Sequence, residues 1–289
     1  MLRTTLLSLT LALSAGLSQA QTAAPLQMKV YQADEHSFAV TSTLITGPRE
    51  AVVVDTGFTR ADGLRIAANV LDSGKQLTTI LVSNADPDYY FGAEVLKNLF
   101  PQAKVVATPA VREKIEAKLQ GKLAFWGPKM GANAPSHPVL PEPLTASTLT
   151  VDGQTLELRG TTGALAHRPY VWVPSLRAIV GNVGVFGNLH VWTADTQKPA
   201  ERQAWLAQLD EMQALKPSVV VPGHMQAGTA MDASAIAYTR SYLQRFDAAA
   251  ASARNSGELI EAMKQAYPQA GMALSLDIGA KVNKGEMPW

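Results

Sequence analysis

Ser83-Asn84-Ala85-Asp86-Pro87-Asp88-Tyr89-Tyr90-Phe91-Gly92 follows directly after the apolar run Ile80-Leu81-Val82, which has the composition of a buried strand. Oxygen-bearing side chains that can bind a metal ion occupy alternate positions of this segment, at Asn84, Asp86 and Asp88. Loops that leave a buried strand often carry functional residues, because the strand is rigid while the loop sequence is free to vary. The segment therefore indicates a functional site at the end of a strand.

Two other segments share this design of apolar strand, tight turn and polar tip. The earlier one is Val52-Val53-Val54-Asp55-Thr56-Gly57, and the later one is Val219-Val220-Val221-Pro222-Gly223-His224. Taken together, the three segments resemble the motifs of the metallo-β-lactamase superfamily. The second motif of that family normally reads His-x-His-x-Asp-His-x-x-Gly, whereas residues 84–92 read Asn-x-Asp-x-Asp-Tyr-x-x-Gly. The resemblance covers roughly residues 28–270. It implies an α/β fold, the four-layer αββα metallo-β-lactamase sandwich, with metal-dependent hydrolysis as the family's chemistry.

The order of predicted elements agrees with such a sandwich. Strands come first, and strand-helix units follow twice, which favours two sheets packed face to face over a single doubly wound sheet. Asp152-Gly153 predicts a type I′ hairpin turn. Residues 38–45 predict a strand, residues 122–143 predict a long irregular loop, and residues 233–254 and 258–267 predict the last two helices.

The first twenty residues have the pattern of a signal peptide. Arg3 is followed by the apolar stretch 6–17 and by Ser18-Gln19-Ala20, a small-x-small cleavage signature. We therefore predict a signal peptide over residues 1–20 and a single metallo-β-lactamase-like domain over 21–289, in a periplasmic or secreted protein. The apolar stretch is too short for a membrane span, which needs about 20 apolar residues.

Composition narrows the range of chemistry and partners. The chain has no cysteine, so disulfides, thiolate metal ligands and cysteine nucleophiles are excluded. Lys and Arg number 25 against 24 Asp and Glu, without a basic stripe that would hold a phosphate backbone. We expect a small-molecule substrate or ligand, and no nucleic acid and no membrane span.

The resemblance implies metal ligands at positions where this chain has other residues. Imidazoles would be expected at 84, 86, 89 and 164 and a bridging carboxylate at 182. The chain has instead Asn84, Asp86, Tyr89, Ala164 and Asn182. Strong donors remain at Asp86, Asp88 and His224, with the amide oxygen of Asn84 as a weaker one. Three donors can hold one metal ion with open positions, so the prediction is a mononuclear site, with Zn²⁺ first, Mn²⁺ or Fe²⁺ as alternatives, or no metal at all.

Other residues are candidates for catalysis or support. Asp88 and His190 are the candidate catalytic residues, with Asp195 a partner for His190. His167 lies three residues beyond the expected ligand position 164, and it is either a ligand from a remodelled loop or a surface histidine. By resemblance, Asp55 orders the neighbouring loop. Asn182 and Tyr89 are further supporting residues.

Two functions remain open from the sequence. The first is a periplasmic hydrolase that uses a metal-activated water on an ester, thioester, lactone or related bond, with a reduced mononuclear site. The second is a catalytically inactive member of the fold that acts as a ligand-binding or interaction module.

Overall fold

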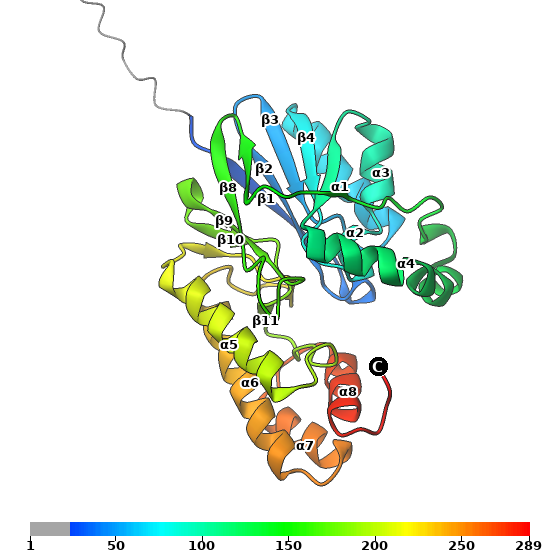
Figure 1. The fold of residues 1–289 in the computed structure, drawn as a ribbon, viewed down its shortest axis with the longest axis vertical. Coiled ribbons are helices and arrows are strands. Elements are labelled where there is room, and N and C mark those ends of the chain that lie inside the picture. Colours follow the sequence, from blue (N-terminus) through cyan, green and yellow to red (C-terminus); the bar gives the residue numbers. More distant parts are fainter. Residues whose placement is uncertain (1–23) are drawn as a thin grey trace, which may run out of the picture.

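The computed structural model describes residues 24–289, and their strands form two sheets packed face to face (Figure 1). The predicted signal peptide, residues 1–20, lies outside the described residues. The first sheet is antiparallel from β1 to β3 and parallel from β3 to β6. Its strands, in spatial order, are β1 (Gln27–Gln32), β2 (Thr41–Thr46), β3 (Glu50–Val54), β4 (Gln76–Leu81), β5 (Lys104–Ala107) and β6 (Glu142–Pro143).

The second sheet is antiparallel except at one edge, where β12 joins β10 in parallel. Its strands, in spatial order, are β12 (Val219–Val220), β10 (Ala178–Val180), β9 (Tyr170–Val173), β8 (Gln154–Arg159) and β7 (Thr148–Val151). A short parallel pair, β11 (Phe186–Gly187) with β13 (His224–Met225), continues beyond it. The predicted hairpin turn is confirmed, because Asp152 and Gly153 both have left-handed φ angles, 46° and 78°.

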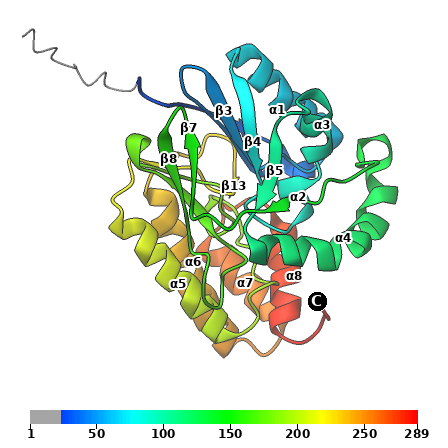
Figure 2. The same ribbon diagram turned by 45° about the horizontal axis from the view of Figure 1, so that its top comes forward.

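Helices cover the outer face of each sheet (Figures 1 and 2). Successive side chains of β3 point to opposite faces, so Val52 and Val54 enter the core between the sheets while Ala51 and Val53 pack under the helices. The predicted αββα sandwich is therefore confirmed. The first sheet carries α1 (Arg60–Ser73), α3 (Ala93–Leu99) and α4 (Pro109–Met130), and the second carries α5 (Pro199–Ala214), α6 (Ser234–Ser252), α7 (Ser256–Ala266) and α8 (Ala273–Asn283).

Three sequence predictions were wrong in detail. The predicted loop 122–143 is helical as far as Met130, because Trp126 packs against Phe38 and Phe58 and anchors the end of α4 despite Pro128 in its last turns. The predicted strand 38–45 begins only at Thr41, because Phe38 and Ala39 turn through left-handed conformations. Finally, α8 follows the two helices that were predicted to be the last.

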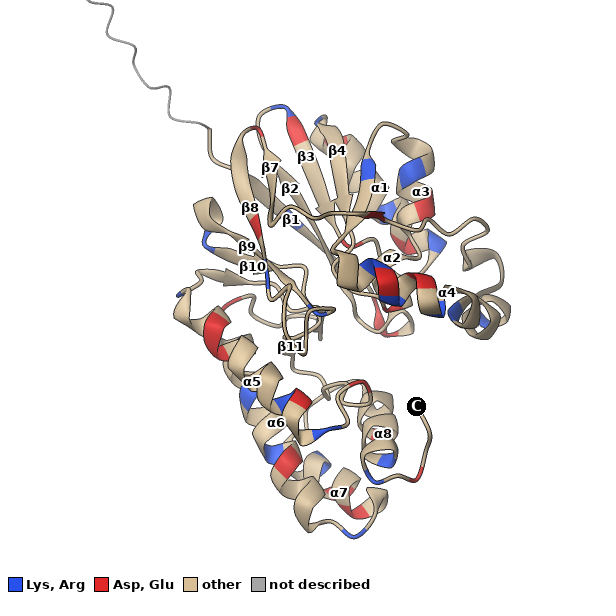
Figure 3. Cartoon of the chain, in the orientation of Figure 1, with Lys and Arg blue, Asp and Glu red and all other residues tan. Residues whose placement is uncertain are grey.

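Basic and acidic residues are interspersed along the chain in Figure 3, for example along α4. Within residues 24–289, no helix is long and apolar enough to cross a membrane.

Candidate functional site

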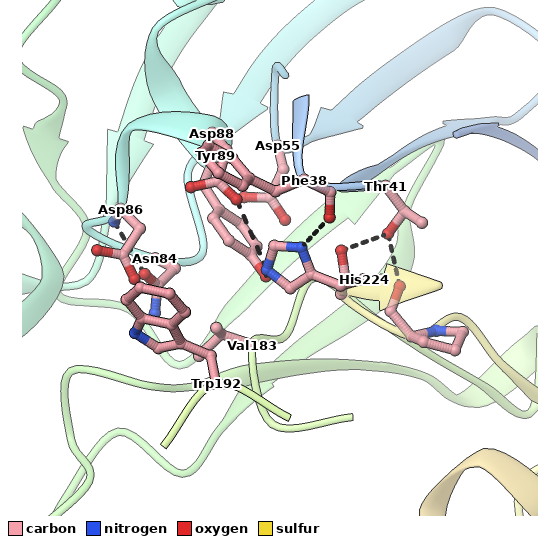
Figure 4. A network of polar contacts seen from close by, with 12 residues as sticks. Phe38, Thr41, Asp55, Asn84, Asp86, Asp88, Tyr89, Val183, Trp192 and His224 are labelled. Carbon is pink, nitrogen blue, oxygen red and sulfur yellow. Dashed lines mark hydrogen bonds and ion pairs between the residues drawn. The ribbon is translucent and has the colours of Figure 1, made fainter. Parts of the chain in front are cut away.

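Loops at the ends of β3, β4, β10 and β12 meet at one edge of the sandwich (Figure 4). The Ser83 amide and hydroxyl both donate to the Asp55 carboxylate, at 2.7 Å each. The Tyr89 hydroxyl lies 3.3 Å from the carbonyl oxygen of Asn182 and 3.1 Å from Nε2 of His224. Contacts within this edge thus join all three motif segments that the sequence singled out.

His224 is held by the segment that precedes β2. Its Nδ1 lies 2.9 Å from the Phe38 carbonyl oxygen, which can only accept, so Nδ1 carries the proton. The Thr41 hydroxyl donates to the carbonyl of Pro222 and fixes the approach to the histidine. Burial lowers the pKa of His224 to about 4, so the ring is neutral and Nε2 presents a lone pair toward the site.

The Tyr89 hydroxyl donates a hydrogen bond to that lone pair. The tyrosine is fully buried, on the short helix α2 (Pro87–Tyr90), and packs with Val40 and Val183. Burial and the neighbouring Asp88 raise the pKa of Tyr89, which keeps the phenol protonated and able to donate. Its single proton is shared between Nε2 of His224 and the Asn182 carbonyl. Gly223 leaves room for this arrangement, since a Cβ there would lie 2.6 Å from the Tyr89 hydroxyl.

Asp88 is the nearest carboxylate to His224. Its Oδ2 lies 3.6 Å from His224 Nε2, and both side chains are buried. Burial and the negative charge of Asp86 raise the pKa of Asp88 well above its ordinary value, so the carboxyl tends to hold its proton. The Tyr89 hydroxyl and the Asp88 carboxyl thus both approach Nε2 of one neutral imidazole.

Asp86 and Asn84 serve the loop rather than His224. The Asn84 side-chain oxygen accepts from the Asp86 amide at 2.9 Å, which is an Asx turn that shapes the loop. The Asp86 carboxylate points away from His224 in Figure 4, and Lys122 of α4 lies 3.5 Å from it. The structure therefore separates Asp86 from the pair formed by Asp88 and His224.

Asp55 and Asn182 brace the strand ends. Asp55 has a left-handed φ of 65°, and its two bonds from Ser83 tie the end of β3 to the end of β4. Burial raises the pKa of Asp55 to about 7, although the Ser83 bonds act in the opposite direction. The Asn182 side chain accepts from the Val185 amide and donates to the Val221 carbonyl, so both of its ends are used inside the protein.

The remaining candidates lie outside this cluster. His190 is buried with Nδ1 3.0 Å from the Tyr242 hydroxyl of α6, and no hydrogen bond in residues 24–289 joins it to Asp88 or His224. Asp195, its expected partner, accepts instead from the indoles of Trp192 at 2.6 Å and Trp289 at 2.8 Å. His167 is half-buried, and burial and the charge of Lys114 lower its pKa to about 4.

These residues do not form the metal site that the resemblance implied. Within the described part of the chain, no three His, Asp or Glu side chains come close enough to hold a metal ion. The lone pair of His224 that would bind a metal already accepts a hydrogen bond from Tyr89. The predicted grouping of Asp86, Asp88 and His224 around one ion is not found, because the Asx turn at Asn84 carries Asp86 toward Lys122.

Two basic residues of this region carried no sequence signal. Lys122 fell inside the predicted irregular loop, and the helical extension of α4 brings it to Asp86. Arg168 follows His167 in a segment without a motif. It is nevertheless only 5% exposed, and its guanidinium donates a hydrogen bond to the Val183 carbonyl. Contacts of this kind depend on the tertiary fold and leave no local pattern.

The sequence of residues 37–224 matches the metallo-β-lactamase superfamily. The chain belongs to that superfamily. Among solved structures, a metallo-β-lactamase family protein of Thermus thermophilus is similar with a TM-score of 0.59 and 18% identity, over 91% of this chain and 92% of that chain. A metallo-β-lactamase of Pontibacter korlensis is similar with a TM-score of 0.52 and 19% identity, over 76% of this chain and 95% of that chain. The DIM-1 metallo-β-lactamase is similar with a TM-score of 0.53 and 16% identity, over 76% of this chain and 93% of that chain. No curated protein sequence matches.

Proposed function

We propose that this metallo-β-lactamase-fold protein binds a small molecule at the Tyr89–His224 edge of the sandwich and does not perform metal-dependent hydrolysis. The observation that carries the proposal is the 3.1 Å contact between the Tyr89 hydroxyl and Nε2 of His224. A hydrolase of this family needs a metal ion to activate water, and a histidine can give its lone pair to a metal or to a phenol proton, but not to both.

The carboxylates support the same proposal. Burial and the charge of Asp86 raise the pKa of Asp88, and a metal ion would have to displace the proton that this shift favours. Asp86 is directed toward Lys122. The polar residues that family enzymes use for metal ions are thus engaged by protein groups in this chain.

The test is the metal content and turnover of the exported protein. We expect far less than one equivalent of any transition metal by elemental analysis after purification without chelators. We also expect no turnover of ester, thioester or lactone substrates, either as purified or with added Zn²⁺, Mn²⁺ or Fe²⁺. One retained equivalent together with metal-dependent turnover would refute the proposal.

A one-metal hydrolase is the second candidate, favoured by the spacing of Asp88 and His224. The 3.6 Å between Asp88 Oδ2 and His224 Nε2 is near the separation of about 3.4 Å expected for two ligands of one tetrahedral Zn²⁺. In that case His224→Ala abolishes metal binding and turnover together. If metal content and turnover are unchanged in this variant, the chemistry lies elsewhere, and His190 and His167 are the next residues to substitute.

The location belongs to the proposal as well. The pattern of residues 1–20 supports export to the periplasm or the medium, with cleavage after Ala20. The mass of the exported protein should correspond to a chain that begins at Gln21. A mass that includes Met1 would refute this part.

A further inference from the structure

Arg168 is a buried cation whose guanidinium is incompletely paired. It lies between β8 and β9 in the chain with 5% of its surface exposed, and the guanidinium carbon lies 4.1 Å from the centroid of the Trp205 ring of α5. Nη2 donates to the Val183 carbonyl at 3.3 Å. Nη1 is buried and has no hydrogen-bond partner among residues 24–289.

No acidic side chain of the described chain forms an ion pair with this guanidinium, although buried arginines are almost always paired. Burial lowers the pKa of Arg168, and the negative charges of Asp195 and Asp86 oppose that shift, so both carboxylates are near enough to interact with the guanidinium without pairing with it. Neither is free to approach, since the indoles of Trp192 and Trp289 hold Asp195 and Lys122 faces Asp86. The N–H groups of Nη1 therefore have no hydrogen-bond acceptor among residues 24–289 and remain able to donate to a ligand.

We propose that Nη1 of Arg168 binds the carboxylate of a small monoanionic ligand, which is the molecule that the proposed function requires at this edge. Guanidinium N–H groups form strong charge-assisted hydrogen bonds with carboxylates. A singly charged group suits the site better than a phosphate dianion, because Asp86 and Asp195 repel additional negative charge.

The body of the ligand is apolar. Trp192 is half-buried and Trp289 is 51% exposed, and their rings meet edge to face with centroids 5.2 Å apart. Each indole donates to one oxygen of the Asp195 carboxylate. Aromatic surfaces of this kind offer stacking and contact area to a ring or an alkyl chain. Access to Arg168 is expected beside Lys122 and Asp86, whose side chains remain 24% and 34% exposed.

The experiment measures binding to the full exported protein by thermal shift and calorimetry. The probes are benzoate, phenylacetate and hexanoate as monocarboxylates, benzyl alcohol as the neutral counterpart, and inorganic phosphate at a mildly alkaline pH where it is mainly the dianion. We expect at least one monocarboxylate to raise Tm and to bind, and neither benzyl alcohol nor phosphate to do so. In Arg168→Met the carboxylate should bind at least about tenfold more weakly. Arg245→Met, an exposed arginine on α6, should bind like the unchanged protein.

Stability separates a ligand-binding role from a structural one. Arg168→Met removes a buried charge with an unpaired donor, so without ligand the variant should be as stable as the unchanged protein or more so. A large loss of Tm without ligand shows that Arg168 supports the fold and overturns the proposal. Binding of none of the monocarboxylates, or equal binding by Arg168→Met, also overturns it. Failure of the proposed function is seen separately, in the metal content and turnover of the unchanged protein.

Discussion

The Tyr89 hydroxyl lies 3.1 Å from Nε2 of His224, and the Phe38 carbonyl holds the opposite nitrogen of the same ring. Both nitrogens of the imidazole are therefore engaged by protein groups. Tyr89 is itself fixed in place, because it packs with Val40 and Val183 in a buried cluster. Binding of a metal to His224 requires this tyrosine to leave, which two substitutions at position 89 can test.

Tyr89→Phe and Tyr89→His should both increase Zn²⁺ affinity, by different amounts. Phenylalanine removes the hydroxyl, and with it a hydrogen bond to His224 worth about 1 kcal/mol, so a roughly fivefold gain is expected. Histidine adds a second imidazole beside Asp88 and His224, which should give a gain of about tenfold or more. Competition against a chromophoric chelator measures both.

Tyr90→Phe is the matched control, because the Tyr90 hydroxyl is buried without a hydrogen-bond partner in the described chain. Its Zn²⁺ affinity should equal that of the unchanged protein. Should Tyr89→His bind Zn²⁺ no more tightly than Tyr90→Phe, the tyrosine is not what keeps the metal out.

Asp55 should make the protein less stable as the pH rises. Its pKa is raised by burial from 3.8 to about 7 in the folded state, so the folded protein holds this proton more tightly than the unfolded chain. The stabilisation is complete below about pH 4 and is lost as the pH rises through about 7, with an upper limit of about 4 kcal/mol. Asp55→Asn keeps an acceptor for Ser83 and should flatten this dependence in urea unfolding between about pH 4.5 and 7.5.

Asp62 should make the stability of the protein depend on pH in the opposite direction. Although burial acts the other way, hydrogen bonds from Tyr31, Ser37 and Thr59 lower the pKa of Asp62. Its contribution is present above the unfolded pKa and is lost as the pH falls, so Asp62→Asn should change the acid side of the profile. An Asp55→Asn profile that still falls across the same pH range as in the unchanged protein would assign the dependence to other groups, such as Asp86 and Asp88.

The fold could be predicted from the sequence because its signals are local. The run Val52-Val53-Val54 is buried on both faces of a sheet, and each strand is followed by a turn that the sequence marks with Asp, Gly or Pro. The end of α4 could not be predicted in this way. Gly121, Gly127 and Pro128 disfavour a helix, and tertiary contacts such as those of Trp126 with Phe38 and Phe58 override them.

The site was predicted less well for a related reason. The sequence identifies which residues stand at the strand ends, but not which way each side chain turns. The Asx turn of Asn84 directs Asp86 to Lys122, and the fully buried Tyr89 reaches His224, from 135 residues away. Both outcomes depend on tertiary packing.

Restoring the family's ligand pattern is the most demanding test of the site. His at positions 84, 86, 89 and 164 with Asp at 182 should raise Zn²⁺ occupancy toward two ions, since imidazole binds Zn²⁺ better than an amide or a phenol and a carboxylate can bridge two ions. The structure also predicts that Asn182→Asp destabilises the fold. Asn182→Asp removes the donor to the Val221 carbonyl and should alone lower the free energy of unfolding by about 1–3 kcal/mol.

The order of substitution therefore matters. Zn²⁺ binding by the variant that keeps Asn182 should reach about one ion, and the stability that Asn182→Asp then removes should be recovered only when metal is present. Elemental analysis and urea unfolding with and without Zn²⁺ measure the two effects. Activity need not return, because catalysis also depends on groups that orient each metal-bound imidazole, and these substitutions add none. If the full variant binds no more Zn²⁺ than the unchanged protein, the strand ends are not arranged as a latent metal site, and the ligand positions carried over from the family do not apply to this chain.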